Sequence, residues 1–227
     1  MRRILLALSL FLPLAVAATG NNIDKISDDI HVAAGQHAGD LSTVSGDVDI
    51  GARAVVGNAG TVSGSMSLGS HAQAGGLSTV SGDIYIAADA VATGSASTVS
   101  GHIHLAQDAQ VQGHLSTVGG AITLDDAQVG GGIETVNGDI TVGANSRVEG
   151  GILVYRPEEH GDHTTLITLL DKQFHVQSTP PTIVIGPHAV VQGTLVFRHP
   201  VVLDVSDSAQ IGPVEGATVK RFSGATP

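Results

Sequence analysis

The chain has 227 residues, a formal net charge of −11, and neither cysteine nor tryptophan. The lack of cysteine excludes disulfides and thiolate metal sites. The acidic balance argues against binding to nucleic acid or anionic lipid headgroups, since both need clustered Lys and Arg. Aromatic residues make up only 3% of the chain, which favours a narrow aliphatic core over a large globular one.

Residues 1–17 have the features of a secretory signal peptide. Arg2 and Arg3 give a positive start, a mostly apolar stretch follows, and Ala15-Val16-Ala17 supplies the small-x-small pattern that signal peptidase accepts. The apolar stretch is short for a membrane span, and no cysteine follows it for lipid attachment. We therefore predict an exported chain in the periplasm, at the outer-envelope surface or outside the cell. No transmembrane segment is expected after cleavage.

One sequence unit recurs about every eighteen residues between residues 18 and 154. Each copy reads Thr-Val-Ser-Gly or a close variant, followed by alternating aliphatic residues. The marker glycines of six copies, spaced 18 or 19 residues apart, are Gly46, Gly64, Gly82, Gly101, Gly120 and Gly138. A six-residue period runs inside each unit, so three short strands make one turn. The predicted fold class is all-β: a single-stranded, three-sided parallel β-helix, or β-solenoid, with about 18 residues per turn.

Alternation along each strand predicts which side chains enter the core. In the first clear copy we expect Val44, Val48 and Ile50 to point inward and Asp47 and Asp49 to point outward. Because stacked turns place equivalent residues about 4.8 Å apart, the inward positions form continuous aliphatic columns. The three expected columns are Val44, Val62, Val80, Val99, Val118 and Val136; Ile50, Leu68, Ile86, Leu105, Leu124 and Val142; and Leu41, Ala59, Leu77, Ala96, Leu115 and Ile133. The outward threonines are expected to form a hydroxyl ladder: Thr43, Thr61, Thr79, Thr98, Thr117 and Thr135.

The period is interrupted once, over residues 155–182, where three prolines bracket an irregular stretch. It resumes at Ile185-Gly186-Pro187-His188-Ala189-Val190-Val191, which has the same pattern as the residues from Ile50 to Val56. We therefore predict one rod with an insertion, followed by final solenoid turns and a C-terminal tail over residues 183–227. The last turn is expected to end near Phe222.

The Leu-Ser-Thr-Val-Ser-Gly-Asp-Ile sequence from Leu77 to Ile84 resembles a bacterial β-strand-repeat family of adhesins. The Ala-x-Val-x-Gly corner, present from Ala109 to Gly113 and from Ala189 to Gly193, is similar to that of the bactofilins, polymer-forming bacterial cytoskeletal proteins. These resemblances imply a solenoid fold and leave end-to-end polymerisation open. Similarity to bactofilins implies a right-handed coil, whereas the unbroken six-residue period also suits left-handed hexapeptide solenoids. The hand therefore remains open.

Potential chemistry concentrates in the insertion, where Glu159, His160 and His163 are candidate metal ligands. Hexapeptide acyltransferases, which this chain resembles in its period, use an active-site histidine, a role for which His160, His163 or His188 are candidates. A solvated polar loop is the alternative interpretation. Outside the insertion, His102 and His104 are expected on an outer face, with His102 beside the Asp83 carboxylate.

We therefore expect a non-catalytic structural or interaction protein of the bacterial envelope, adhesin-like or self-assembling, with no cofactor. Its expected partners are a second copy, joined end-to-end or laterally, or another envelope or surface component. The alternative is a metal-binding or hexapeptide-type enzymatic module centred on residues 155–182. The outward Thr, Ser and Asp columns are the expected binding surface.

Overall fold

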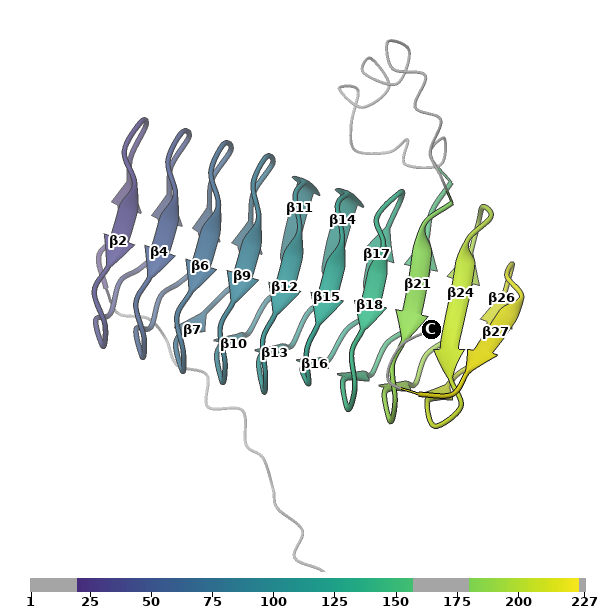
Figure 1. The fold of residues 1–227 in the computed structure, drawn as a ribbon. Helices are drawn as coiled ribbons and strands as arrows, with labels where there is room; N and C mark the ends of the chain where they lie inside the picture. Colours follow the sequence, from purple (N-terminus) through teal and green to yellow (C-terminus); the bar gives the residue numbers. More distant parts are fainter. Residues whose placement is uncertain (1–19, 157–179, 225–227) are drawn as a thin grey trace, which may run out of the picture.

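The computed structural model describes residues 20–156 and 180–224, which form a parallel β-solenoid of about nine turns (Figure 1). Paired residues on neighbouring turns lie 18 apart, as in Ile30 and Val48, or 19 apart, as in Ile84 and Ile103. The predicted fold class is thereby confirmed. Among the described residues no helix is long and apolar enough to span a membrane.

Three sheets make the sides of the coil, and all strand pairs within them that the structure describes are parallel. Sheet A consists of β1 (Ile23–Asp24), β3 (Leu41–Ser42), β5 (Ala59–Gly60), β8 (Leu77–Ser78), β11 (Ala96–Ser100), β14 (Leu115–Gly119), β17 (Ile133–Thr135), β20 (Ile152–Val154), β23 (Leu195–Phe197) and β26 (Val214–Glu215). Sheet B consists of β2 (Ile30–Val32), β4 (Val48–Ile50), β6 (Met66–Leu68), β9 (Ile84–Ile86), β12 (Ile103–Leu105), β15 (Ile122–Leu124), β18 (Ile140–Val142), β21 (Thr182–Ile185), β24 (Val202–Ser206) and β27 (Val219–Phe222). Sheet C is shorter and consists of β7 (Gln73–Ala74), β10 (Val91–Ala92), β13 (Gln110–Val111), β16 (Gln128–Val129), β19 (Arg147–Val148), β22 (Val190–Val191) and β25 (Gln210–Ile211).

The core is a stack of aliphatic columns, as predicted for two of the three columns. The column that starts at Ile50 and the column that starts at Leu41 are fully buried throughout the regular turns. No single turn buries its apolar side chains alone, so the stability of each turn depends on its two neighbours. Small alanines such as Ala54 and Ala72 fill the narrow side next to sheet C.

The expected orientation of the Thr-Val pair was wrong. The six threonines that begin at Thr43 are buried, whereas Val44, Val62 and Val80 expose 48%, 46% and 45% of their surface. Of the six valines expected inside, Val136 alone is buried. Leu41 fixes this outcome, because strict alternation from an inward Leu41 turns the residue two positions on inward and the residue three positions on outward. Threonine is tolerated inside because its hydroxyl has a backbone partner. The Oγ1 of Thr79, for example, donates to the carbonyl of Gly64 at 3.0 Å.

The corner from sheet A to sheet B, which we call the A–B corner, is held by close backbone packing. A Cβ placed on Gly64 would collide with the carbonyl oxygen of Gly46, and the same relation holds from one marker glycine to the next. At every marker glycine except Gly120, which Ala121 follows, the side chain of the next residue accepts a hydrogen bond from the turn above. Asp47 Oδ1 accepts from the Ser65 N–H at 2.8 Å, and Asp83 Oδ1 accepts from the His102 N–H at 2.7 Å.

The corner from sheet B to sheet C, the B–C corner, uses a different device. In each turn except the last, one residue adopts a left-handed backbone conformation there, with φ between 49° and 60° for the non-glycine members. This conformation is uncommon outside glycine, although Asn, Asp and His adopt it more readily than other residues. The residues at this position are Gly35, Arg53, His71, Asp89, Asp108, Asp126, Asn145 and His188.

The interruption leaves the ladders in register. β18 pairs with β21 through Ile140 and Ile183, and β20 pairs with β23 through Ile152 and Leu195. Of the predicted insertion, residues 157–179 lie outside the described residues, as do the predicted signal peptide and the last three residues of the tail. The final strand ends at Phe222, the predicted end of the last turn.

Candidate functional site

The outer face of sheet A carries small uncharged side chains over five consecutive turns. The residues that point outward there are Ser42, Gly60, Ser78, Ser97 and Ser116, each exposed or half-buried. Acidic residues occupy the equivalent positions on either side, Asp24 before this run and Glu134 after it. Within the run the face is flat and neutral, so another β-sheet could approach it closely.

The exposed valines extend this face around the A–B corner. Val44, Val62 and Val80 stack directly above one another, and the Ser81 N–H donates to the Val62 carbonyl at 2.9 Å, which fixes the spacing. Val99 and Val118 continue the row and are half-buried. Branched aliphatic side chains in a row on the surface are typical of interaction sites and not of a solvated face. We call these ten residues the neutral strip: Ser42, Gly60, Ser78, Ser97, Ser116, Val44, Val62, Val80, Val99 and Val118.

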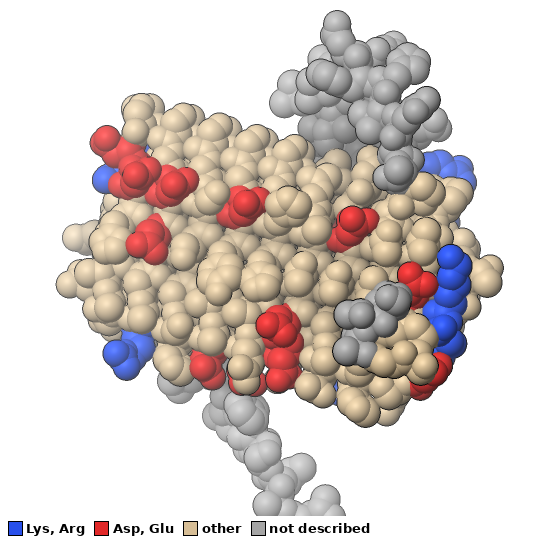
Figure 2. All heavy atoms as spheres, in the orientation of Figure 1, with Lys and Arg blue, Asp and Glu red and all other residues tan. Residues whose placement is uncertain are grey.

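Charge is distributed unevenly along the rod. Figure 2 shows acidic side chains along the visible face, with a group of them on the N-terminal turns, and basic side chains at both ends. The first two turns hold two cations, Lys25 and Arg53, and six acids: Asp24, Asp28, Asp29, Asp40, Asp47 and Asp49. The last turns carry as many cations as acids, namely Arg198, Lys220 and Arg221 with Asp204, Asp207 and Glu215, and the Arg156 Nε donates to the Arg198 carbonyl at 3.2 Å.

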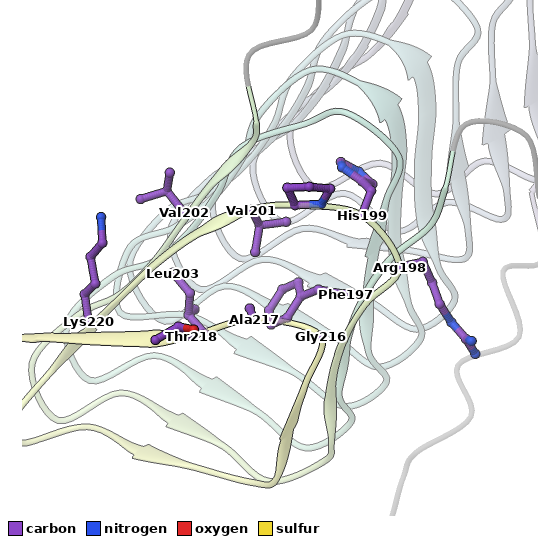
Figure 3. A pocket seen from close by; sticks show the side chains of 11 residues that line it. Phe197, Arg198, His199, Val201, Val202, Leu203, Gly216, Ala217, Thr218 and Lys220 are labelled. Carbon is purple, nitrogen blue, oxygen red and sulfur yellow. The ribbon is translucent and has the colours of Figure 1, made fainter.

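The C-terminal end of the rod is closed by a shortened turn. From Leu195 to Leu203 the chain advances eight positions between sheets A and B, whereas from Val214 to Val219 it advances only five. The last turn therefore cuts across the corner and leaves an open hollow of about 630 Å³ beneath it. In Figure 3 Phe197, Leu203 and Ala217 face into this hollow, whereas Arg198 and Lys220 point away from it.

A charged residue occupies a core position in that last turn. Arg221 pairs with Val205, so it stands in the column that holds aliphatic residues such as Ile50 and Leu68 in the earlier turns. Its Nη1 donates to the Ser206 carbonyl at 3.0 Å, and the side chain remains exposed. A cation at the end of a core column opposes the stacking of a further turn, as charged residues do at protected sheet edges.

Sheet B carries a second shallow hollow, of about 330 Å³, over Ser65 and Ser67. Tyr85 borders it and stacks on His104, with ring centroids 5.2 Å apart. His102 lies on the same side, but its contact differs from the expected one. The Asp83 carboxylate accepts from the main-chain N–H of His102, and the His102 ring nitrogen Nδ1 accepts from the Ala121 N–H at 2.9 Å.

Tyr155 lies where the regular turns end. Its hydroxyl donates to Glu134 Oε2 at 3.4 Å. Burial raises the pKa of Tyr155, the negative charge of Glu134 and this hydrogen bond raise it further, and Arg198 opposes them. The phenol therefore stays protonated at neutral pH and links β17 to the end of β20.

The candidate metal ligands Glu159, His160 and His163 lie outside the described residues. His188 is exposed at the left-handed position of the B–C corner, and its N–H donates to Ser208 Oγ at 3.1 Å. In residues 20–156 and 180–224 no three His, Asp or Glu side chains converge as metal ligands would.

Comparison with protein-family models, with characterised proteins and with solved structures gives no match for this chain. The fold assignment therefore depends on the geometry of the turns. The resemblance to adhesins and bactofilins stays a prediction.

Proposed function

We propose that this chain is an exported structural and interaction protein of the bacterial envelope, adhesin-like and non-catalytic, which binds through the neutral strip. The observation that carries the proposal is the strip itself. It is a flat, uncharged surface with exposed valines on a chain whose formal net charge is −11. Interaction surfaces are depleted in charge at their centre, whereas a solvated face of an acidic protein is not.

The closed C-terminal end favours a rod of fixed length over a bactofilin-like polymer. Arg221 in the core column and the shortened last turn both oppose the addition of a second copy at that end. Electron microscopy of the mature protein checks this point. We expect uniform short rods, and open filaments would contradict a fixed length. An Arg221→Val variant, which restores the apolar column, should show more end-to-end association than the parent.

The interaction role is tested with two matched variants in cells that export the protein. Ser78→Lys places a charge in the middle of the neutral strip, and Ser67→Lys places the same charge on sheet B one turn earlier. We expect both variants to be exported and folded, and only Ser78→Lys to be released from the envelope fraction. Equal retention of both variants would contradict the proposal.

A further inference from the structure

The shallow hollow on sheet B is a slot with a wall on each side. The outward residues of this sheet, in the order of the turns, are His31, Asp49, Ser67, Tyr85, His104, Thr123 and Thr141. Ser67 has the smallest side chain among them, and Ser65, its neighbour toward the A–B corner, is small too. The side chains of the turns before and after therefore project beyond this turn. Because neighbouring turns are about 4.8 Å apart, the two walls are about 10 Å apart.

One wall of the slot is the face of an aromatic ring. Tyr85 stacks on His104 with the ring planes 8° apart. His104 belongs to the turn after Tyr85, so it covers one face of the phenol ring, and the opposite face is turned toward Ser67. The face of an aromatic ring attracts cations through its quadrupole. The slot, with a volume of about 330 Å³, therefore has room for one more planar group in the stack.

Three carboxylates surround the same space. Asp49 lies on the wall opposite Tyr85, and Asp47 and Asp83 line the end of the slot next to the A–B corner. Asp47 and Asp83 each use one oxygen to accept a main-chain N–H, which fixes the carboxylate and leaves its second oxygen for a ligand. None of the described residues that line the slot is Lys or Arg. Positive charge is therefore the property that a ligand needs here.

We propose that this slot binds the planar cation of a small guanidino compound, stacked on Tyr85 and hydrogen-bonded to the carboxylates. A guanidinium is flat and permanently charged, and its N–H groups donate along its edge. Its face can therefore lie on the ring while its edge reaches Asp47 or Asp83. An ammonium group has the charge but no face that stacks.

The three acids also restrict the rest of the ligand. They would repel a carboxylate carried by the ligand itself, as in free arginine, and they favour a compound with an amine at its other end. The site goes beyond the proposed function and does not depend on it, because the neutral strip lies on sheet A and at the A–B corner. Exposed ion pairs and cation–π contacts each contribute little, so we expect a dissociation constant in the millimolar range.

Agmatine, which is decarboxylated arginine, is the first probe, and the two tyrosines of the chain are the reporters. In NMR spectra of the mature protein labelled in its tyrosine rings, agmatine should shift the Tyr85 signal and leave the Tyr155 signal in place. N-carbamoylputrescine replaces the guanidinium with an uncharged group of the same shape, and putrescine lacks the planar group. Both should bind at least about fivefold more weakly than agmatine. An unchanged Tyr85 signal, or equal binding of the three compounds, would overturn the proposal.

A protein partner could bring the same group on an arginine side chain, and a short peptide separates the two sources. Glycyl-arginyl-glycine amide with an acetylated N-terminus carries the guanidinium on a peptide backbone. We expect it to bind no more tightly than agmatine. Clearly tighter binding of the peptide would assign the slot to a protein partner and would overturn the small compound as its ligand.

Variants test the two walls and the floor, followed through the backbone amide signals of β6. Ser67→Lys fills the slot with a cation of the chain itself and should abolish binding, whereas Thr141→Lys, farther along the same face, should bind agmatine like the parent. Tyr85→Leu should weaken binding at least about fivefold, and Tyr85→Phe, which keeps the ring, by less than about twofold. Unchanged binding by Ser67→Lys would overturn the slot, and equal losses in the two Tyr85 variants would overturn the stacking.

The slot and the neutral strip fail separately. Ser78→Lys should lose envelope retention and still bind agmatine, whereas Ser67→Lys should lose agmatine and stay in the envelope. If the parent binds agmatine but Ser78→Lys stays in the envelope, the slot stands and the interaction role of the strip is wrong. If Ser78→Lys is released and the parent ignores agmatine, the strip stands and the slot is wrong.

Discussion

The A–B corner and the B–C corner change the direction of the chain between two sheets by different means. At the A–B corner the chain turns by packing backbone against backbone, with glycine on the inside and a buried threonine that satisfies a carbonyl. At the B–C corner it turns with one exposed left-handed residue in each turn except the last. At the A–B corner the residue types repeat almost unchanged from turn to turn, whereas the left-handed position of the B–C corner accepts Arg, His, Asp and Asn. Close packing therefore restricts which residue types a corner accepts, whereas the change of chain direction alone does not.

The strongest test of this contrast is a single methyl group at the A–B corner. Gly64→Ala should lose about 3 kcal/mol of unfolding free energy, because its Cβ would meet the carbonyl of Gly46 and the backbone is held by neighbouring turns. Gly119→Ala is the matched control at the same corner, since no atom lies within 4 Å of a Cβ there. Urea unfolding followed by circular dichroism compares them. Equal losses would show that the corner is not close-packed.

Two reciprocal substitutions test whether threonine is the buried residue and valine the exposed residue of the Thr-Val pair. Thr79→Val should cost about 1 to 2 kcal/mol, because the buried carbonyl of Gly64 loses its donor. Val80→Thr should change the free energy of unfolding by less than about 0.5 kcal/mol, since that side chain is exposed. If Val80→Thr proved the more costly of the two, valine would be the inward residue.

The side-chain acceptors that follow the marker glycines contribute less to stability, because they are exposed and water can replace them. His102→Ala removes the acceptor for the Ala121 N–H and should cost about 0.5 to 1 kcal/mol at neutral pH. Thermal unfolding of the parent and the variant at neutral pH measures the difference. An unchanged midpoint would argue against the ring as acceptor.

The smallest expected effect is at the tolerant B–C corner. Arg53 holds a left-handed conformation with φ of 58°, which Asn adopts more easily. Arg53→Asn should therefore stabilise the chain by about 0.5 kcal/mol, and the reverse change Asn145→Arg should destabilise it by a similar amount. Shifts of the urea midpoint in the same direction for both variants would contradict this explanation.

Sequence periodicity was sufficient to predict the sheet-forming sides of the fold. Ile50 and Leu41 lie in columns that hold an aliphatic residue in each turn, and their burial was predicted from the sequence period and from hydrophobicity alone. The A–B corner was predicted wrongly, because hydrophobicity ranks valine above threonine, and the backbone partner of Thr79 is visible only in three dimensions. The left-handed column escaped notice for a different reason. Arg53, His71 and Asp89 share a backbone conformation and no chemistry that the sequence displays.

The candidate site depended on that same corner. The outward Thr, Ser and Asp columns were expected as the binding surface, but the threonines are buried, and Val62 and Val80 face outward in their place. The neutral strip was therefore missed together with the orientation of the threonines. The sequence did contain one signal for the correct orientation. Leu41 was predicted to point inward, and strict alternation from Leu41 places Val44 outward.

The side-chain acceptors described at the A–B corner all point one way along the chain. Asn22, Asp40 and Asn58 at the C–A corner follow the same rule, each accepting from a residue 18 positions later. A turn that has already formed thus presents acceptors to the turn that comes next. For a chain that crosses a membrane with its N-terminus first, each completed turn would serve as the template for its successor. Assembly of the rod would then proceed in the order of export, without waiting for the whole chain.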